Sequence, residues 1–257
     1  MERSIKVMSF NMRCRTEADG PNFFDLRREK IAAMLASENP DLIGFQEAND
    51  FMADWLERTL TDYTVIGHGR ETDGSGEGMY VAYRRDRFRL HAYRTEALSL
   101  TPNVAGSRLI STDQSKCPRT FACAELLCRE SGKLFAFYNI HTDHKGASAR
   151  LLECAFLMRD VAQTNLPFVI TGDFNDYPDS APIALVLSTA DSLGTVDATA
   201  NIKGSFHAFK GDVGTCKIDY IFTNMQVDPA KTYAVADDDR GGCYYSDHNA
   251  LCAFLTL

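Results

Sequence analysis

Short runs of apolar residues, rich in Val, Ile, Phe and Tyr, recur from one end of the chain to the other. Most of these runs are too short for a helix and are bounded by polar or turn-forming residues, which is the pattern of buried β-strands. They predict strands over residues 5–11, 42–46, 63–67, 79–83, 119–127, 133–141, 168–171, 218–223 and 250–257. Strands therefore dominate the predicted structure.

Helical periodicity occurs between some of these strands. In residues 25–37 apolar positions recur at spacings of three and four, and Asn39-Pro40 follows as a stop signal. The same reasoning predicts helices over residues 48–60, 147–163 and 183–187. Residues 68–78 and 101–118 are predicted to be long loops. The first loop is glycine-rich but lacks the Gly-Lys-Ser/Thr ending of a phosphate-binding loop, so we interpret it as a hairpin connection.

Nothing in the composition divides the chain. It has 257 residues, 45% of them hydrophobic, which is enough for one sizeable core, and it contains no Ser/Gly linker, charge block or low-complexity tract. We therefore predict a single domain over residues 1–257. A strand–helix–strand pattern that ends in Glu47 is echoed by one that ends in Asp173, which suggests two similar halves packed face to face.

The charge balance limits the partners. Lys plus Arg number 27 against 35 Asp plus Glu, a net charge of −8, whereas a protein that binds long polyanions usually has a basic surface. We therefore expect no stable duplex DNA partner. No apolar stretch approaches the roughly 18 residues of a membrane span, and the eight cysteines include no C-x-x-C pair. These features favour a cytoplasmic protein with reduced, buried cysteines.

Polar side chains stand where the predicted strands begin or end. The clearest examples are Asn11, Glu47, His141, Asp143, His144, Asp173, Asn175, Asp219, Asp247 and His248. Strands that each deliver one oxygen ligand or one imidazole to the same sheet edge assemble an active site on a rigid scaffold. Each residue alone has a structural explanation, since Glu47 can start a helix and Asp173 can belong to a turn. Their recurrence at strand ends is what indicates a site.

The types of side chain select a metal. The carboxylates of Glu47, Asp173 and Asp247 are hard oxygen donors that suit Mg²⁺ or Mn²⁺, and the amides of Asn11 and Asn175 add to them. Such a cation polarises a phosphoryl oxygen, and a neighbouring carboxylate can orient or deprotonate water for in-line attack. The residues therefore predict metal-dependent chemistry on a phosphoester.

Six motifs follow one another along the 257 residues, namely Ser-Phe-Asn11, Gly-Phe-Gln-Glu47, Asn-Ile-His141, Gly-Asp173-Phe-Asn175, Ile-Asp219-Tyr-Ile and Ser-Asp247-His248. This set resembles the metal-dependent endonuclease/exonuclease/phosphatase family. The family includes deoxyribonucleases, abasic-site endonucleases, deadenylases, inositol polyphosphate phosphatases and sphingomyelinases. The resemblance implies an α/β fold, a four-layer α/β/β/α sandwich of two packed mixed β-sheets, with the site in a cleft at one sheet edge.

The resemblance also implies a role for each residue. Glu47 would be the main metal carboxylate, helped by Asn11 and Asp247. Asp173 and Asn175 would orient the attacking water and the phosphate.

The histidines would act on the phosphate. Asp219 would hold the His248 imidazole in one tautomer and keep it protonated, so that it stabilises the developing charge, and His141 would contact a phosphate oxygen. Either Asp173 or His248 could take the proton of the water, and the sequence leaves both open.

Departures from the family pattern bear on the substrate. Arg13 stands where many members have an acid or an amide, and a guanidinium suits a phosphate contact but cannot ligate a metal. Arg119, in Cys117-Pro118-Arg119, is expected near the phosphate as well, together with His144. The segment from Asp173 to Ser180 resembles a branch shared by deadenylases and bacterial phosphodiesterase-like proteins.

These observations predict a hydrolase that uses Mg²⁺ or Mn²⁺ to cleave a phosphodiester or phosphomonoester. Its expected substrate is a small phosphoester or a single-stranded nucleic acid, because the acidic chain offers few contacts to a long polyanion. A nuclease for single-stranded DNA or RNA is the main alternative. A catalytically silent binding module of the same fold is the second alternative.

Overall fold

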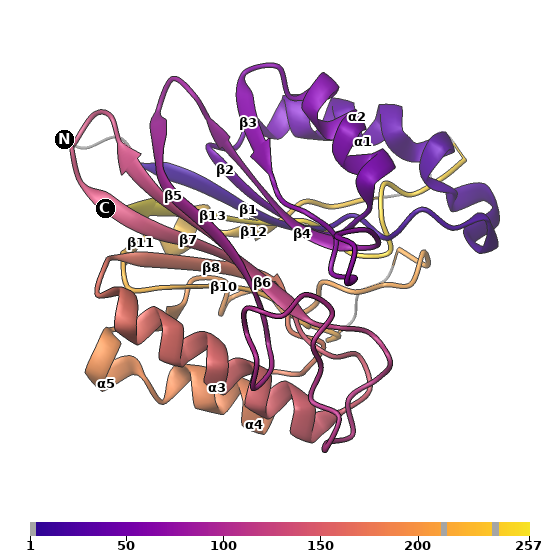
Figure 1. The fold of residues 1–257 in the computed structure, drawn as a ribbon. Coiled ribbons are helices and arrows are strands. Elements are labelled where there is room, and N and C mark those ends of the chain that lie inside the picture. The colour runs from indigo at the N-terminus through magenta and orange to yellow at the C-terminus, as the bar shows by residue number, and fades with distance from the viewer. Residues whose placement is uncertain (1–3, 212–214, 238–241) are drawn as a thin grey trace.

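Two β-sheets pack face to face in the computed structural model, which describes residues 4–211, 215–237 and 242–257 (Figure 1). In the first sheet the strand order is β11-β13-β1-β2-β4-β3, with β12 also paired to β13; in the second it is β5-β6-β7-β8-β10-β9. The first sheet contains β1 (Ile5–Asn11), β2 (Leu42–Ala48), β3 (Tyr63–Ile66), β4 (Gly78–Arg84), β11 (Gln226–Val227), β12 (Tyr233–Ala234) and β13 (Leu251–Thr256). The second contains β5 (Phe88–Ala97), β6 (Thr120–Cys128), β7 (Leu134–His141), β8 (Phe168–Asp173), β9 (Val196–Asp197) and β10 (Asp219–Thr223).

Helices form the two outer layers. The helices are α1 (Phe24–Glu38), α2 (Asp50–Thr59), α3 (Ala147–Thr164), α4 (Ala181–Leu187) and α5 (Ala190–Leu193), with short 3₁₀ turns at Glu17–Asn22 and Pro229–Lys231. Figure 1 shows α1 and α2 over the first sheet and α3 to α5 on the far side of the second. The predicted four-layer α/β/β/α sandwich is therefore the observed fold. Among the described residues, no helix is long and apolar enough to cross a membrane.

Burial on both faces explains why the strands read as continuous apolar runs. Successive side chains of β1 alternate between two apolar layers. Val7 packs in the layer between the two sheets, whereas Met8 and Phe10 pack in the layer beneath α1 and α2. The second sheet does the same, since Phe137 faces the first sheet and Tyr138 packs with the α3 side.

Two parallel strand pairs direct the chain to one end of the sandwich. β1 pairs in parallel with β2 across α1, and β7 pairs in parallel with β8 across α3, while every other pairing is antiparallel among the described residues. These two β–α–β units are the echo that the sequence suggested. Because parallel strands end at the same edge of their sheet, each unit places its last polar residues together.

The main differences from the sequence prediction are strands that the apolar pattern does not reveal. β5 is a long edge strand of the second sheet that was not predicted, because its residues are mostly exposed or half-buried and include two arginines and a glutamate. The short β9, β11 and β12 were also missed. The glycine-rich residues 68–78 do form the connection between β3 and β4, as predicted, with Gly69 bridged to Gly78.

Candidate active site

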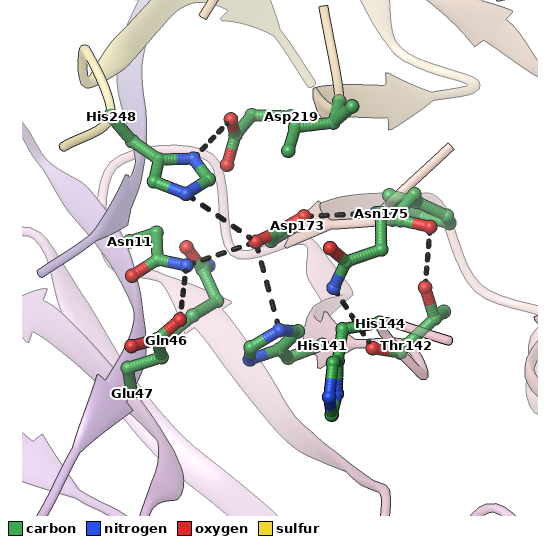
Figure 2. A network of polar contacts seen from close by, with 12 residues as sticks. Asn11, Gln46, Glu47, His141, Thr142, His144, Asp173, Asn175, Asp219 and His248 are labelled. Atoms are coloured by element: carbon green, nitrogen blue, oxygen red, sulfur yellow. Dashed lines mark hydrogen bonds and ion pairs between the residues drawn. The ribbon is translucent and has the colours of Figure 1, made fainter. Parts of the chain in front are cut away.

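The polar residues at the strand ends line one pocket, but they come from both sheets rather than from a single sheet edge as expected (Figure 2). β1 and β2 of the first sheet bring Asn11 and Glu47 to the pocket, and β7, β8 and β10 of the second sheet bring His141, Asp173 and Asp219. The expectation of one edge was wrong because the two parallel units lie in different sheets. The site is therefore built where the ends of two packed sheets meet.

The structure brings the residues named from the sequence to this one place, except that Asp143 is buried behind Arg119 and does not line the pocket. The pocket is lined by Arg13, Glu47, Arg119, His141, His144, Asp173, Asn175, Asp247 and His248. Asn11 and Asp219 lie directly behind these residues and hydrogen-bond to them. The pocket has a volume of about 330 Å³, which is large enough for a small ligand.

Glu47 is held in a fixed orientation. Its Oε1 accepts a hydrogen bond from Asn11 Nδ2 at 3.0 Å and its Oε2 accepts one from the backbone N–H of Cys14 at 2.9 Å. Burial opposes ionisation, but these hydrogen bonds outweigh it and lower the pKa of Glu47. The residue also has a φ of 62° at an irregularity in the β2–β4 pairing, a strained backbone of the kind found at functional sites. Glu47 is thus an ionised, preorganised carboxylate.

Asn11 connects the two sheets. Its Nδ2 donates to Glu47 and also to Asp173 Oδ2 at 2.9 Å, while its Oδ1 accepts from the backbone N–H of Arg13 at 2.9 Å. The amide therefore presents its nitrogen to the two carboxylates. In this arrangement Asn11 acts as a spacer between acids that would otherwise repel each other.

Asp173 is the centre of the polar network (Figure 2). Its Oδ1 accepts from the backbone N–H of Asn175 at 2.9 Å, and its Oδ2 lies 3.6 Å from His141 Nε2 and 3.8 Å from His248 Nε2. Burial and the negative charge of Asp219 raise the pKa of Asp173 to about 7. A carboxylate with that pKa can both accept and release a proton near neutral pH.

His248 and Asp219 form a buried pair. Asp219 Oδ2 lies 2.8 Å from His248 Nδ1, and Phe206 packs against the imidazole with ring centroids 4.8 Å apart. Burial disfavours the charged imidazole, but Asp219 overcomes this effect and raises the pKa of His248 to about 10. His248 is therefore a cation at neutral pH, with Nε2 on the side of Asp173.

His141 has the opposite character. Burial, together with the positive charges of Arg119 and Arg70, lowers its pKa well below the ordinary value. No described residue hydrogen-bonds to its Nδ1. The site thus contains one charged imidazole and one neutral imidazole on either side of the same carboxylate.

The three groups expected to bind phosphate differ in availability. Arg13 lines the pocket, but its Nε and Nη2 donate to Asp19 at 3.0 and 2.9 Å. Arg119 is 2% exposed and donates Nη2 to His144 Nδ1 at 2.9 Å, and no described residue accepts from its Nε or Nη1. Arg119 and His144 therefore offer an open anion-binding face, whereas the guanidinium of Arg13 is already paired.

Sequence reasoning missed several residues of the pocket wall. Arg70 and Glu77, in the connection between β3 and β4, line the pocket and pair with each other at 3.0 Å. Cys14 and Phe206 line it too. Loop residues follow no hydrophobic periodicity, so their positions cannot be predicted in the way that strand ends can. The signal that the sequence did offer was an arginine within a glycine-rich connection.

The donor set fits a hard divalent cation at one position. Glu47, His141 and Asp173 can bring ligand atoms within 4.8 Å of one another, and so can Asp173, Asp219 and His248. The second group already contains a protonated histidine bonded to its acid, which cannot ligate a metal. The first combines two carboxylates that crowd one another, a situation that a cation relieves. Asp247, whose pKa is raised by burial and by Glu47, lies at the same pocket.

Comparison with known proteins places the chain in a family. The sequence profile described as Endonuclease/Exonuclease/phosphatase family matches residues 8–248. An uncharacterized protein of Acanthamoeba polyphaga mimivirus is 26% identical over 156 residues, an alignment that spans 58% of each chain.

Solved structures share the whole fold. The endonuclease/exonuclease/phosphatase from Bacteroides vulgatus superposes with a TM-score of 0.90 and 26% identity over 100% of both chains. The Bacteroides thetaiotaomicron mannosyl-6-phosphatase Bt3783 superposes with a TM-score of 0.88 and 24% identity, covering 99% of this chain and 100% of the other. With the family profile matched over nearly its whole length, the chain belongs to the endonuclease/exonuclease/phosphatase family of phosphoesterases.

Proposed function

We propose that the protein is a divalent-metal-dependent hydrolase that cleaves a small phosphoester by in-line attack of water. The observation that carries the proposal is the position of Asp173, between the charged imidazole of His248 and the neutral imidazole of His141, beside the ionised carboxylate of Glu47. Acid–base chemistry on water and charge stabilisation on phosphate need these groups within reach of one substrate atom.

Glu47, together with Asp247 at the same pocket, would hold Mg²⁺ or Mn²⁺, which leaves Asp173 free to act on water. When bound, the cation would polarise a phosphoryl oxygen and lower the pKa of bound water. Asn11 would contribute by keeping Glu47 and Asp173 apart, since its Oδ1 is used by the backbone of Arg13.

The chain's own side chains would manage the protons. His248 carries a proton at neutral pH and cannot accept another, so Asp173 takes the proton of the attacking water. The charged His248, fixed by Asp219, stabilises negative charge on the phosphoryl oxygens. His141 donates from Nε2 as a neutral imidazole, and the Asn175 backbone N–H keeps Asp173 in place.

Hydrolysis of p-nitrophenyl phosphate and bis-p-nitrophenyl phosphate tests the proposal. The protein is first stripped with EDTA and then assayed with no metal, Mg²⁺ or Mn²⁺. We expect turnover only with a divalent metal, and a loss on the order of 10³-fold in Asp173→Asn. Glu47→Gln should raise the metal concentration needed for half-maximal rate.

Glu57→Gln is the matched control for Glu47→Gln, because Glu57 is an exposed glutamate on α2, away from the pocket. It should leave the metal dependence unchanged. Turnover that survives EDTA, or that is unaffected in Asp173→Asn, would contradict the proposal. Metal-dependent degradation of single-stranded oligonucleotides with no turnover of the small esters would favour a nuclease instead. A protein that binds phosphate but hydrolyses no ester would be a silent binding module.

A further inference from the structure

Two buried arginines on one wall of the pocket have unused hydrogen-bond donors. Arg70 is 9% exposed and Arg119 is 2% exposed, and both line the pocket. Within the described part of the chain, no hydrogen bond involves Nε or Nη1 of either side chain, although Arg119 Nε lies 3.7 Å from Asp143 Oδ2. Buried charged donors without a hydrogen-bond partner are costly, so Nε and Nη1 of Arg70 and Nη1 of Arg119 indicate a missing anionic ligand at this wall.

Other arginines of the same protein show what a structural role looks like. Arg27 is fully buried and is satisfied by backbone carbonyls, with its Nε, Nη1 and Nη2 all donating. Arg13 makes a two-pronged pair with Asp19. Arg70 and Arg119 differ from both: Arg70 Nη2 pairs with Glu77 and Arg119 Nη2 donates to His144 Nδ1, while no described residue hydrogen-bonds to Nε or Nη1 of either arginine.

The backbone holds Arg70 in position. Gly69 and Gly78 form a bridge, the backbone N–H of Arg70 donates to the Glu77 carbonyl at 3.1 Å, and Arg70 Nη2 lies 3.0 Å from Glu77 Oε2. A Cβ at Gly69 would lie 2.0 Å from the carbonyl oxygen of Ser75, so this hairpin closes only with glycine at that position. Arg70 is therefore presented by a tight, hydrogen-bonded turn rather than by a loose loop.

Arg70 and Arg119 act on the same part of the pocket from two sheets. Arg70 precedes β4 of the first sheet, and Arg119 precedes β6 of the second. Both guanidinium groups lower the pKa of His141 and of His144, which places them around the same pair of imidazoles. Two guanidinium groups converge there, each next to one carboxylate, Glu77 beside Arg70 and Asp143 beside Arg119.

We propose that Arg70 and Arg119 form a clamp for a terminal, doubly charged phosphate group, so that the substrates are phosphomonoesters. This inference rests on the proposed function, whose site it extends. Arg70 is the specificity-determining residue of the clamp, and no sequence motif pointed to it.

The number of phosphoryl oxygens supports a monoester. A monoester has three non-bridging oxygens and two negative charges at neutral pH, whereas a diester has two and one. The groups around Asp173 serve the reacting face of the phosphorus, and they include one charged imidazole, that of His248. Each of the two further guanidinium groups already faces a carboxylate, but their unused donors are more than the two oxygens of a diester need, and they match the third oxygen of a monoester.

A pair of esters with one leaving group tests the clamp. Methyl p-nitrophenyl phosphate differs from p-nitrophenyl phosphate by a methyl group on one oxygen, which removes one negative charge. We therefore compare kcat/KM for the two esters in the wild type and in Arg70→Gln. We expect Arg70→Gln to lower kcat/KM for the monoester about 10- to 100-fold and for the diester less than about threefold. Arg70→Lys should recover part of the monoester loss, because it restores charge without the planar fork.

Binding of inorganic phosphate and of dimethyl phosphate gives a readout independent of turnover. Isothermal titration calorimetry in the presence of Mg²⁺ should show that Arg70→Gln raises the Kd for inorganic phosphate by the factor expected for the monoester. The Kd for dimethyl phosphate should be unchanged. If the wild type hydrolyses no ester but phosphate binding still depends on Arg70, the proposed function fails while the clamp stands. Arg58→Gln, an exposed arginine on α2, controls for the change in net charge.

Three results would overturn the clamp. Equal losses on both esters would show that Arg70 binds an oxygen common to both. No loss on either, in a variant with wild-type circular dichroism and Tm, would make Arg70 structural. A larger loss on the diester would show that Arg70 favours a singly charged phosphate over a doubly charged one.

Discussion

The floor and the wall of the pocket are built differently. On the floor, the ends of β1, β2, β7, β8 and β10 carry polar side chains that are bonded to one another, as Asp219 is to His248 and Asn11 is to Glu47. On the wall, the connections before β4 and β6 carry Arg70 and Arg119, whose Nε and Nη1 make no hydrogen bond with any described residue. Under the proposed function, the sheets fix the reaction, while the choice of substrate depends on the loops.

The floor and the wall also differ in how many of their polar groups already have hydrogen-bond partners. Asp173 accepts hydrogen bonds from Asn11 and from the backbone of Asn175 before any ligand arrives, so its position costs little at the moment of reaction. Arg70 and Arg119, in contrast, have guanidinium donors that would gain hydrogen-bond partners only when an anion binds. Changes on the floor should therefore reduce turnover of every ester, and changes on the wall should discriminate between esters.

Asp219→Asn should have the largest effect on turnover. Asp219 is the group that raises the pKa of His248, so its amide variant should let that pKa fall toward the ordinary value of 6.5. His248 would then be neutral at pH 8, and we expect kcat/KM to fall on the order of 10³-fold there for monoester and diester alike.

The pH profile from 5 to 10 measures this effect. The raised pKa of His248 keeps the imidazole charged in the wild type up to about pH 10. In Asp219→Asn the charged form is lost as the pH rises through the ordinary range, so activity should recover partly in acid and decline above neutral pH. An unchanged profile, or a loss confined to monoesters, would break the comparison. Asp179→Asn, an exposed carboxylate, is the control.

The difference between floor and wall also explains what the sequence could predict. Glu47 and Asp173 follow apolar runs that read as strands, and a strand end fixes where a side chain lies. The expectation of a single sheet edge was wrong because apolar periodicity does not tell which sheet a strand joins. β5 escaped notice because an edge strand rich in charged residues lacks the apolar signal.

Arginines on loops could not be ranked from the sequence. Arg13 has the chemistry to bind phosphate, but Asp19, six residues away, takes its guanidinium. Arg70 lies in a segment without periodicity, and its position depends on a close approach of Gly69 and Gly78 that only the folded chain reveals. Which donors stay free is a property of tertiary contacts.

Asp143→Asn should lower kcat/KM less than Asp219→Asn does, and it should act mainly on Arg119 in the wall. Asp143 is fully buried and accepts from the backbone N–H groups of Ser115, Lys145 and Gly146, and its Oδ2 lies 3.7 Å from Arg119 Nε. Burial would raise the pKa of Asp143, but a hydrogen bond from the Ser115 hydroxyl and these backbone hydrogen bonds hold it at about 2, so the carboxylate is charged at working pH. It is thus a positioning residue for Arg119.

Replacing this carboxylate with an amide turns one acceptor into a donor that faces other donors. We expect kcat/KM for p-nitrophenyl phosphate to fall about tenfold, mainly through KM, and that for methyl p-nitrophenyl phosphate to change less. Steady-state kinetics with both esters measures the split. An equal fall in kcat for both esters would show that Asp143 supports the reaction itself, as the floor residues do, and not the binding of monoesters.

Glu153→Gln should have the smallest effect on turnover and should separate stability from catalysis. Glu153, on α3, is fully buried behind the wall, where its Oε2 accepts from the backbone N–H of Asp143 at 2.7 Å. Burial raises its pKa from 4.5 to about 7. The native state therefore keeps a proton that the unfolded state has lost, so the wild type loses stability as pH rises from about 4.5 to about 7, by at most about 3 kcal/mol. The glutamine variant should lack this contribution, so that urea unfolding at pH 5 and pH 8 gives a variant relatively more stable at pH 8, with similar kcat/KM for both esters. An equal pH dependence of the unfolding free energy in the variant and the wild type would show that Glu153 is already ionised in the folded protein.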